Sequence, residues 1–395
     1  MLLIFAQTTK MDYFSSQFKL GILGGGQLGK MLLFETRKFD IQTYVLDPSD
    51  EAPCAIACNK FYQGDLTDFD TVYEFGKKVD VLTFEIELVN IEALQKLEDE
   101  GTKVFPSPTT LKQIQNKGFQ KDFYVKNNIP TSPHRRFYNL DELRSAVNEG
   151  EVTVPFVWKA AEFGYDGNGV KIVRSISDLD SLQDGECISE ELVPFKNELA
   201  VIVARSVSGE IVTYPVVEME FHPEANQVEY VICPARIDKN VADKARELAL
   251  SVSQAFSHVG LLAVEMFQTN DDEILINEVA PRPHNSGHYS IEGSYTSQFE
   301  NHLRAILDLP LGNTDSKVAG IMVNLTGAEG YSGNVVYQNI EKIMAIPGVT
   351  PHIYGKKQTR PFRKMGHVTI VNEDMDAARK IAEQVKNTIK VISAT

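Results

Sequence analysis

Apolar positions in the first part of the chain fall into short runs separated by segments of helical period. The apolar runs lie at residues 18–23, 41–46 and 81–85, and the helix-like segments lie at 30–38, 69–78 and 91–100. Strands that alternate with helices are typical of a parallel sheet covered by helices. We therefore expect a small Rossmann-like α/β unit that begins near residue 18.

Later in the chain the apolar runs follow one another without helices between them. Runs at residues 201–207, 211–218 and 228–233 predict antiparallel strands. The helix predicted at 241–259 has apolar positions three and four residues apart, so one face is expected to pack on that sheet. The tail predicts strands near 319–325, 350–354 and 367–371 and a last amphipathic helix at 375–389.

A single helix is expected over residues 111–127, ahead of the antiparallel part. Its lysines are Lys112, Lys117, Lys121 and Lys126. Charged residues spread along a helix in this way are most often a solvated face, and this is the favoured interpretation for each lysine taken alone.

The most informative stretch is a predicted hairpin at residues 261–280, whose turn lies near Asp271-Asp272. If the hairpin closes symmetrically about those two aspartates, Glu265 stands directly opposite Glu278. Their Cβ atoms would then be roughly 5 Å apart, a separation at which like charges destabilise the pairing. Two interpretations have equal weight: the acids hold a divalent cation such as Mg²⁺, or one is protonated or paired with lysine or arginine.

Two glycine-rich loops follow strands. The first, Gly24-Gly25-Gly26-Gln27-Leu28-Gly29, leads into a helix and has Asp47 at the end of the next strand, as in dinucleotide-binding turns. It is weak evidence for NAD, because such a turn holds any phosphate. The second, Gly164-Tyr165-Asp166-Gly167-Asn168-Gly169, joins two strands and predicts a flap that covers phosphates.

Two segments concentrate cationic and polar side chains. The hairpin is followed by Arg282-Pro283-His284-Asn285-Ser286-Gly287-His288, which has the composition of an active-site loop. Residues 356–364 carry five cations, for which a solvated basic loop and an anion site have equal weight by composition.

Composition excludes several classes of protein. With 54 acidic and 39 basic residues, the net charge of −15 argues against general binding of nucleic acid or anionic membranes. Cys54, Cys58, Cys187 and Cys233 form no C-x-x-C pair, so we expect reduced thiols and a cytoplasmic protein. No apolar run is long enough to span a membrane.

The Rossmann-like start, the flap after a strand lysine and the glutamate hairpin together resemble the ATP-grasp superfamily. Within it, the closest resemblance is to the N5-carboxyaminoimidazole ribonucleotide synthase family of purine biosynthesis. The motifs that carry it are the two glycine-rich loops, Ala280-Pro281-Arg282-Pro283-His284-Asn285-Ser286-Gly287-His288 and Arg363-Lys364-Met365-Gly366-His367.

The resemblance implies an α/β chain, α+β overall, with an ATP-grasp fold. It divides into a loose extension at 1–17, a Rossmann-like domain at 18–112, a small flap domain at 113–193, a large antiparallel-sheet domain at 194–315, and a β-rich remnant with the final helix at 316–395. A homodimer is implied by the resemblance only.

The resemblance also implies a role for each candidate residue. Those expected to bind ATP are Lys117, Lys159, Gly164, Tyr165, Asp166, Gly167, Asn168, Gly169, Glu190, Glu191, Leu192, Val193, Glu198, Asn277 and Glu278. Those expected to meet the ribonucleotide are Gly26, Gln27, Leu28, Glu85, Arg282, His284, Asn285, Ser286, Lys356, Arg363 and Lys364, with Arg282, His284, Lys356, Arg363 and Asp166 also in catalysis. Glu265 and Glu278 would hold Mg²⁺ or Mn²⁺.

The implied reaction uses ATP to phosphorylate bicarbonate, and the resulting carboxyphosphate carboxylates the exocyclic amine of 5-aminoimidazole ribonucleotide. Either His284 or Asp166 would take the amine proton. Asn168 departs from the family, which has Arg or Lys there, and Asn116-Lys117 replaces the usual Asp-Arg. Rival hypotheses are a dinucleotide-dependent oxidoreductase, a non-catalytic nucleotide sensor, and another ATP-grasp ligase such as one that uses formate.

Overall fold

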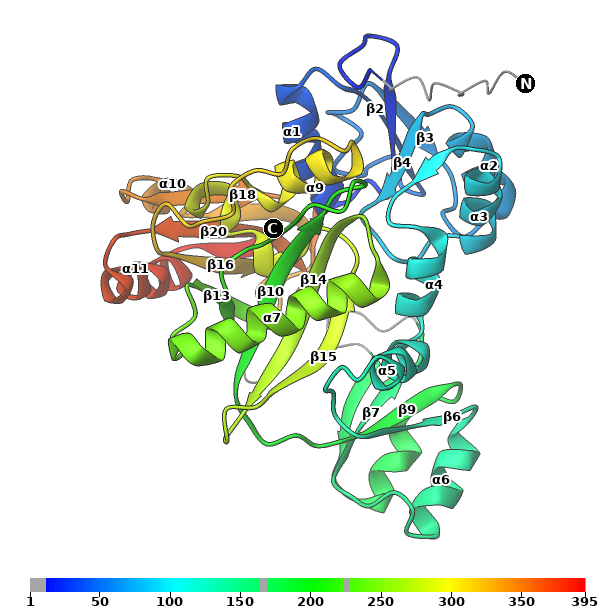
Figure 1. The fold of residues 1–395 in the computed structure, drawn as a ribbon. Helices are drawn as coiled ribbons and strands as arrows, with labels where there is room; N and C mark the ends of the chain where they lie inside the picture. Colours follow the sequence, from blue (N-terminus) through cyan, green and yellow to red (C-terminus); the bar gives the residue numbers. More distant parts are fainter. Residues whose placement is uncertain (1–11, 163–168, 223–226, 395) are drawn as a thin grey trace, which may run out of the picture.

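The computed structural model describes residues 12–162, 169–222 and 227–394, which form four β-sheets surrounded by helices (Figure 1). The predictions made for residues 164–168 lie outside the described residues.

The N-terminal domain is a parallel sheet with the strand order β3-β2-β1-β4-β5, as the alternating pattern predicts. Its strands are β1 (Lys19–Leu23), β2 (Gln42–Asp47), β3 (Lys60–Gln63), β4 (Val81–Phe84) and β5 (Lys103–Val104). Its helices are α1 (Gln27–Lys38), α2 (Phe69–Gly76) and α3 (Ile91–Asp99).

Residues 12–17, which were expected to belong to a loose extension, include a side chain of the core. Tyr13 is buried beside Phe18, with the two rings edge to face at 5.3 Å between centroids. Its aromatic surface gives the chain a reason to order before β1, so the core begins earlier than the apolar run indicates.

The small domain lies at the bottom of Figure 1 and contains an antiparallel sheet with the order β6-β9-β7-β8. The strands are β6 (His134–Phe137), β7 (Phe156–Ala160), β8 (Val170–Val173) and β9 (Cys187–Glu191). Helix α6 (Leu140–Asn148) and the 3₁₀ turn η1 (Ile176–Ser181) belong to the same domain.

The helix expected over residues 111–127 is two helices, α4 (Pro108–Gln115) and α5 (Lys117–Lys126). The break is at Asn116, whose backbone is extended and whose side chain accepts a hydrogen bond from the N–H of Phe119. Asparagine at such a position caps a new helix, and the N–H of Lys117 donates to the carbonyl of Ala161 instead of continuing α4. The break therefore fixes Lys117 at the start of α5.

The third sheet has nine strands and is antiparallel throughout. Its order is β15-β14-β10-β12-β13-β16-β20-β18, with β11 paired to β10. The bounds are β10 (Phe195–Arg205), β11 (Ile211–Thr213), β12 (Val217–Phe221), β13 (Val228–Cys233), β14 (Gly260–Thr269), β15 (Ile274–Ala280), β16 (Gly320–Thr326), β18 (Val349–Ile353) and β20 (Lys364–Val371).

Helix α7 (Lys239–Phe256) covers one face of this sheet, in front of β10 and β14 in Figure 1. Val241, Ala245 and Val252 are fully or almost fully buried and pack with apolar residues of β10 and β14. The helix ends at Ser257, in the left-handed conformation with φ 50°. The packing predicted from its apolar positions is confirmed.

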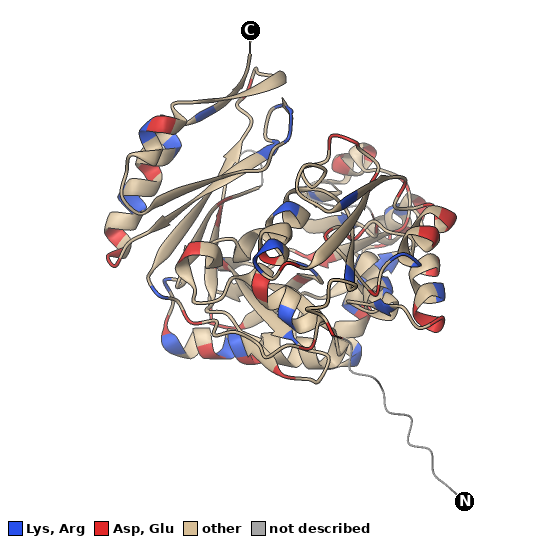
Figure 2. Ribbon diagram, turned by 90° about the horizontal axis from the view of Figure 1, so that it is seen from above, with Lys and Arg blue, Asp and Glu red and all other residues tan. Residues whose placement is uncertain are grey.

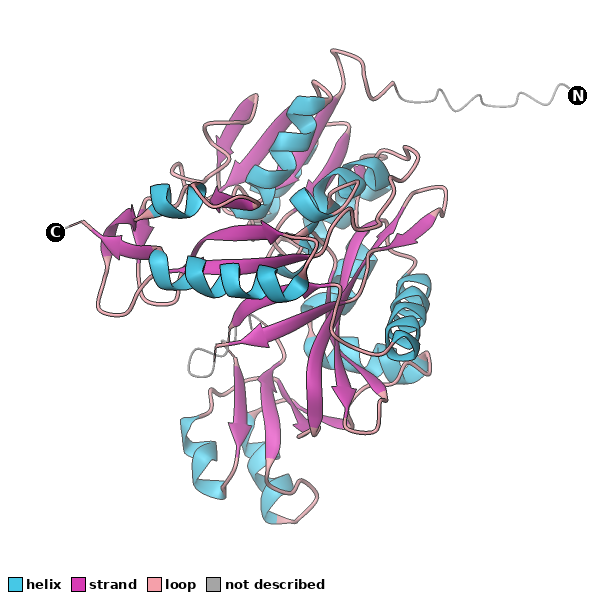
Figure 3. Cartoon of the chain, turned by 90° about the vertical axis from the view of Figure 1, so that its left-hand side faces the viewer, coloured by secondary structure: helices cyan, strands magenta, loops and turns pink. Residues whose placement is uncertain are grey.

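The remaining elements belong to the C-terminal part of the chain. Helix α11 (Met375–Thr388) lies along the strands β16 and β20 (Figure 3), with Ala378, Ala382 and Val385 buried in the shared core. The other members are α8 (Ser290–Gly293), α9 (Gln298–Ile306), α10 (Ile340–Met344), η2 (Asn285–Gly287), and a small sheet of β17 (Gly333–Gln338), β19 (Gln358–Thr359) and β21 (Lys390–Ser393).

The boundary expected at residue 316 falls inside one continuous sheet. Strand β13 of the large domain pairs with β16 from Tyr230–Val323 to Cys233–Gly320. The apolar runs predicted the strands on both sides, but strand pairing across a long connection leaves no local signal in the sequence. The large domain and the C-terminal segment are therefore one structural layer.

Charge is distributed over the outer surface. Acidic and basic positions are interspersed along the outer helices (Figure 2), which agrees with a solvated protein surface. In residues 12–162, 169–222 and 227–394, every helix is too short or too polar to cross a bilayer.

Candidate active site

The site is organised by the hairpin of β14 and β15, in which Glu265 is paired with Glu278 as predicted. The route to that pairing differs from the symmetrical closure that we expected. Nearer the turn Met266 pairs with Ile276, and a bulge at Asn277 shifts the register by one residue. Bulges re-aim side chains, and this one lets Asn277 and Glu278 both reach lysines on neighbouring elements.

The two hairpin acids have unlike surroundings. Glu278 forms an ion pair with Lys117, and this ammonium holds the pKa of Glu278 below its ordinary value. Glu265 is raised in pKa by burial, and the charges of Glu278 and Glu198 add to the effect. Burial also raises the pKa of Glu198, to about 7. Burial and two neighbouring carboxylates thus act together on Glu265, against the charges of Lys117 and Lys364.

A second charged cluster lies between the small domain and β15. Lys159 on β7 contacts Glu190 at 2.9 Å and donates to the side-chain oxygen of Asn277 at 2.9 Å. Lys121 of α5 contacts the other oxygen of Glu190 at 3.1 Å, and Ser132 donates to that oxygen at 2.6 Å. Although burial opposes ionisation, Lys159 and Lys121 hold the pKa of Glu190 to about 2. Its carboxylate, which belongs to the residues expected to bind ATP, is therefore engaged within the protein.

The loop after the hairpin is held by one buried amide. Gln298, at the start of α9, accepts from the N–H of His284 at 2.9 Å and donates to its carbonyl at 2.7 Å. It also lies 3.0 Å from Nδ1 of His288. Gly287 is required at this place, because a Cβ there would lie 2.4 Å from the Gln298 oxygen. The loop conformation is thus fixed from within the protein.

The side chains of that loop face the hairpin acids and the N-terminal domain. His284 lies 3.4 Å from Glu265 through Nε2, and its Nδ1 lies 2.9 Å from Ser286 Oγ. Arg282 contacts Glu87, which follows β4, at 3.2 Å. Asn285 exchanges hydrogen bonds with Asn324 of β16 at 2.9 Å. The loop therefore connects three parts of the molecule.

The basic segment at residues 356–364 borders the same region from the C-terminal side. Lys356 donates to the carbonyl of Lys364 at 2.8 Å, which closes the segment on itself. Arg363 donates to the carbonyl of Gln358 at 2.6 Å, and burial lowers its pKa. Lys364 is near enough to Glu265 for its charge to oppose the rise in that pKa. Lys364 is thus the member of the basic segment whose charge acts on the hairpin acids.

The first glycine-rich loop is occupied by the protein's own acids. Glu85 accepts from the N–H groups of Gly26, Leu28 and Gly29 at 2.8, 3.1 and 3.1 Å. Asp47 accepts from the N–H of Gly25 at 2.7 Å. A carboxylate at a helix N-terminus satisfies the groups that a phosphate would use. Glu85 and Asp47 thus occupy the N–H groups of this turn in the structure described, and the ribonucleotide contact expected for Gly26, Gln27 and Leu28 stays a prediction.

The remaining ATP candidates can be placed only in part. Of the predicted flap, Gly169 is described: its φ is 76° and its carbonyl accepts from the N–H of Ala160 at 2.8 Å. Asp166 and its neighbours lie outside the described residues. Glu191 donates its N–H to the carbonyl of Pro133, while Leu192 is partly exposed.

Pattern reasoning did not single out several residues of this site. Lys121 is buried, and it lies three residues from the buried Tyr124 and three from Gly118. This helical spacing places Lys121 on the inner face of α5, and it is the one feature of the sequence that could have indicated its burial. No sequence pattern indicated a role for Glu87 or Gln298, because their roles depend on contacts between distant segments.

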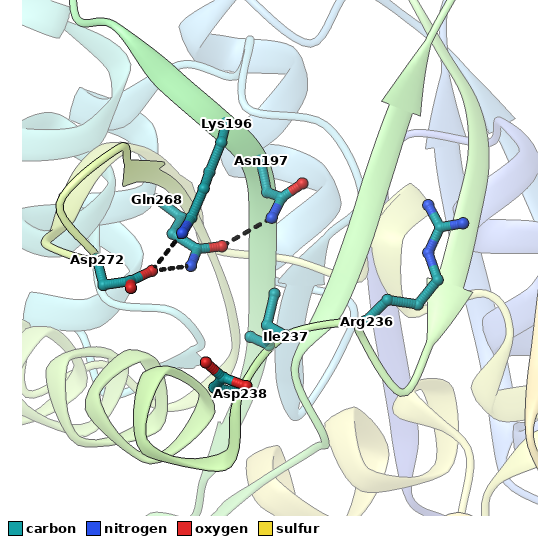
Figure 4. Close-up of a pocket in the computed structure, with 7 residues that line it drawn as sticks. All are labelled: Lys196, Asn197, Arg236, Ile237, Asp238, Gln268 and Asp272. Carbon is teal, nitrogen blue, oxygen red and sulfur yellow. Dashed lines mark hydrogen bonds and ion pairs between the residues drawn. The ribbon is translucent and has the colours of Figure 1, made fainter.

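A cavity lies elsewhere in the described residues. It measures about 480 Å³ and is lined by Lys196, Asn197, Arg236, Ile237, Asp238, Gln268 and Asp272 (Figure 4). Asn197 and Gln268 are one and three positions from Glu198 and Glu265, so they point to the opposite face of the sheet. Their amides bind each other at 2.8 Å, and Lys196 binds Asp272 at 2.6 Å.

Family descriptions match three consecutive parts of the chain. They are "Ribonucleotide synthetase preATP-grasp domain" at residues 18–115, "ATP-grasp domain" at 122–299 and "Phosphoribosylaminoimidazole carboxylase C-terminal domain" at 320–381. With the paired-glutamate hairpin and the small β7–β8 domain, they define an ATP-grasp ligase.

Sequence and structure comparisons identify the branch of this superfamily. The chain is 37% identical over 362 residues to N5-carboxyaminoimidazole ribonucleotide synthase of Bacillus subtilis, covering 90% of this chain and 92% of the relative. The corresponding synthetase structure from Thermotoga maritima has a TM-score of 0.87 at 43% identity, over 95% of this chain and all of that one. The chain belongs to the N5-carboxyaminoimidazole ribonucleotide synthase family.

One relative was solved with both kinds of ligand. The synthase from Aspergillus clavatus in complex with ADP and 5-aminoimidazole ribonucleotide has a TM-score of 0.85 at 35% identity. The match covers 94% of this chain and 98% of that chain.

Proposed function

We propose that the protein uses ATP and bicarbonate to carboxylate 5-aminoimidazole ribonucleotide on its exocyclic amine, as a step of purine biosynthesis. The observation that carries the proposal is the 3.4 Å contact between His284 and Glu265. This contact joins the acidic hairpin to the loop at residues 282–288. The hairpin is suited to phosphoryl transfer, and the cationic loop is suited to binding an anionic acceptor. The ligands of the Aspergillus clavatus relative support the same pairing of nucleotide and ribonucleotide.

ATP would lie between the small domain and the sheet face that carries Glu198, Glu265 and Glu278. Lys117 and Lys159 are the cations aimed at this cleft from the small-domain side, through their contacts with Glu278 and Asn277. Fixed positive charge stabilises the negative charge that spreads over a γ-phosphoryl group during transfer. Because the carboxylate of Glu190 is already engaged, we assign adenine recognition to the chain that follows it.

The facing carboxylates of Glu265 and Glu278 fit Mg²⁺ or Mn²⁺. The pairing of the two residues across the hairpin supports this, and the pKa of Glu265 is raised mainly by burial and further by the charges of Glu278 and Glu198. A divalent cation bound there would neutralise phosphate charge and orient the γ-phosphoryl group. Lys117 would then exchange part of its contact with Glu278 for phosphate.

The chemistry requires two bond exchanges. A bicarbonate oxygen attacks the γ-phosphorus as the bond to ADP breaks, which gives carboxyphosphate. The exocyclic amine then attacks the carboxyl carbon, and phosphate leaves with the bonding electrons. The amine loses one proton, for which His284 is the described candidate, with Ser286 and Glu265 orienting its ring. Asp166 remains the alternative.

Lys356, Arg363 and Lys364 would receive the phosphate of the ribonucleotide, with Arg282 nearer the reacting groups. Guanidinium and ammonium groups bind phosphate by charge-assisted hydrogen bonds. The loop at residues 24–29 would border this site and contribute the side chain of Gln27, while Glu85 and Asp47 accept hydrogen bonds from its N–H groups.

The test is ADP release measured with each substrate omitted in turn. Turnover should require ATP, bicarbonate and 5-aminoimidazole ribonucleotide together. Equal turnover with formate and another ribonucleotide amine would instead support a formate-using ligase. Nucleotide binding without turnover under all combinations would support a sensor.

Assembly and location are separate proposals. We propose a homodimer, from family resemblance alone, and sedimentation velocity would test it. A cytoplasmic location is supported by four cysteines that form no disulfide.

A further inference from the structure

Lys121 is a charged residue that the reaction described above does not use. It is 2% exposed, on the inner face of α5, among side chains that order the small domain. An interior ammonium is costly unless its donors are satisfied and its charge is compensated. The contacts of Lys121 should therefore show why a charged side chain is buried at this position.

The side-chain contacts of Lys121 described here all lie on the nucleotide side of the small domain. Its ammonium donates to Thr131 at 2.7 Å and to Ser132 at 3.0 Å, and it contacts Glu190 at 3.1 Å. Thr131 in turn donates to the carbonyl of Ile276, the residue before the bulge of β15. Lys121 therefore connects α5 and β9 with the hairpin that carries the metal candidates.

Glu190 divides its carboxylate between two lysines. One oxygen contacts Lys159 at 2.9 Å, and the other contacts Lys121 and Ser132. Two ammonium groups and one carboxylate leave a net positive charge on the cluster. Without Lys121, Glu190 and Lys159 would form a simple neutral pair, and Lys159 would attract phosphate less strongly.

We propose that Lys121 is a positioning residue for ATP, which holds and compensates Glu190 so that Glu190 orients Lys159 without cancelling its charge. The proposal rests on the proposed function only in taking Lys159 as a ligand of the ATP phosphates. Lys121 itself touches no substrate in this scheme. Its effect is on the phosphate half of the nucleotide and not on the adenosine half.

The decisive experiment compares nucleotides that differ only in phosphate. Dissociation constants for ATP, ADP and adenosine are measured by calorimetry on wild-type protein, Lys121→Met and Lys121→Arg. Lys126→Met, an exposed lysine of the same helix, is the matched control. Thermal unfolding without nucleotide shows whether each variant is folded.

Lys121→Met should weaken ATP and ADP roughly ten- to a hundredfold, the range for one lost charge-assisted contact, while adenosine affinity changes little. Lys121→Arg keeps the charge but not the compact geometry of the ammonium group. Its affinity for ATP should therefore lie between those of Lys121→Met and wild type. Removing the opposing charge with Lys121→Met/Glu190→Gln should recover phosphate binding relative to Lys121→Met.

Two results would overturn the proposal. Unchanged ATP affinity in folded Lys121→Met would show that Glu190 needs no compensation. Equal loss of ATP and adenosine would show a general structural role. If Lys121→Met does not fold, Lys121→Gln, which also removes the charge, carries the same comparison, and wild-type ATP affinity in it would count against the proposal. None of these readouts requires carboxylation, so failure of the proposed function is seen separately, as absence of ribonucleotide-dependent ADP release.

Discussion

Glu265 lies directly opposite Glu278 only because Asn277 is an extra residue in β15. In the register set by the turn, where Met266 pairs with Ile276, Glu265 would face Asn277 instead. The bulge also turns Asn277 toward Lys159 and Glu278 toward Lys117. One irregular residue thus aims both an amide and a carboxylate at the lysines of the small domain.

Glu265→Gln and Glu278→Gln should each lower ATP turnover by orders of magnitude while the protein remains folded. Each change removes one charge of the proposed metal pair but keeps the size and hydrogen-bonding capacity of the side chain. The measurement is ADP release as a function of Mg²⁺ concentration, with Glu273→Gln in the exposed turn as the control. Wild-type rates in either variant would remove the metal assignment.

Stability should depend on Glu190 in a defined range of acidity. The folded pKa is about 2, below the ordinary value of 4.5, so its ionised form stabilises the fold above pH 4.5. That contribution, roughly 3 kcal/mol if the whole shift is realised, is lost as the pH falls through 4.5 toward 2. Urea unfolding of wild type and Glu190→Gln should give free energies that converge over this interval. A difference that stays constant would contradict the assignment.

NAD and NADP should not bind. The N–H groups that would hold a dinucleotide phosphate already receive Glu85 and Asp47, and a second anion would be repelled. Calorimetric titration should give no heat of binding for wild type, and Asp47→Ala should not change this result. Micromolar binding of either cofactor would favour the oxidoreductase hypothesis.

Lys356→Ala and Arg363→Ala should each weaken binding of the ribonucleotide and leave the affinity for ATP nearly unchanged. Loss of one charge-assisted phosphate contact corresponds to roughly 1.5–3 kcal/mol, about ten- to a hundredfold in affinity. The measurement is the dissociation constant of each substrate, with Lys342→Ala on the exposed side of α10 as control. The opposite result, in which ATP binding is lost and ribonucleotide binding is retained, would mean that the basic segment belongs to the ATP pocket.

Gln298→Met should separate loop order from nucleotide binding. Methionine fills a similar space but loses both hydrogen bonds to the backbone of His284. Ribonucleotide-dependent turnover should fall well below wild type. ATP should still bind, because the Gln298 amide contacts the loop at residues 282–288. Gln384→Met, at an exposed position of α11, is the control. Full turnover in Gln298→Met would show that the loop orders itself.

The pairing of Glu265 with Glu278 was predicted from a symmetrical closure of the hairpin about its turn, but in the structure it results from the bulge, which shifts the register by one residue. The bulge at Asn277 was not predictable, since it is selected by contacts with lysines far away in the chain. Lys121 was assigned to a solvated face because a charge pattern alone does not show which side of a helix is covered. Glu85 was expected at the substrate, but its hydrogen bonds to α1 depend on the spacing of two parallel strands.

The continuous sheet has a consequence for how this chain could be divided. Strand β13 is an interior strand because β16 receives its backbone hydrogen bonds, from Tyr230–Val323 onward. A fragment that stopped before β16 would leave β13 as a bare edge with unpaired N–H and C=O groups, a surface prone to pairing with other chains. The C-terminal segment is therefore unsuited to removal or exchange as a module.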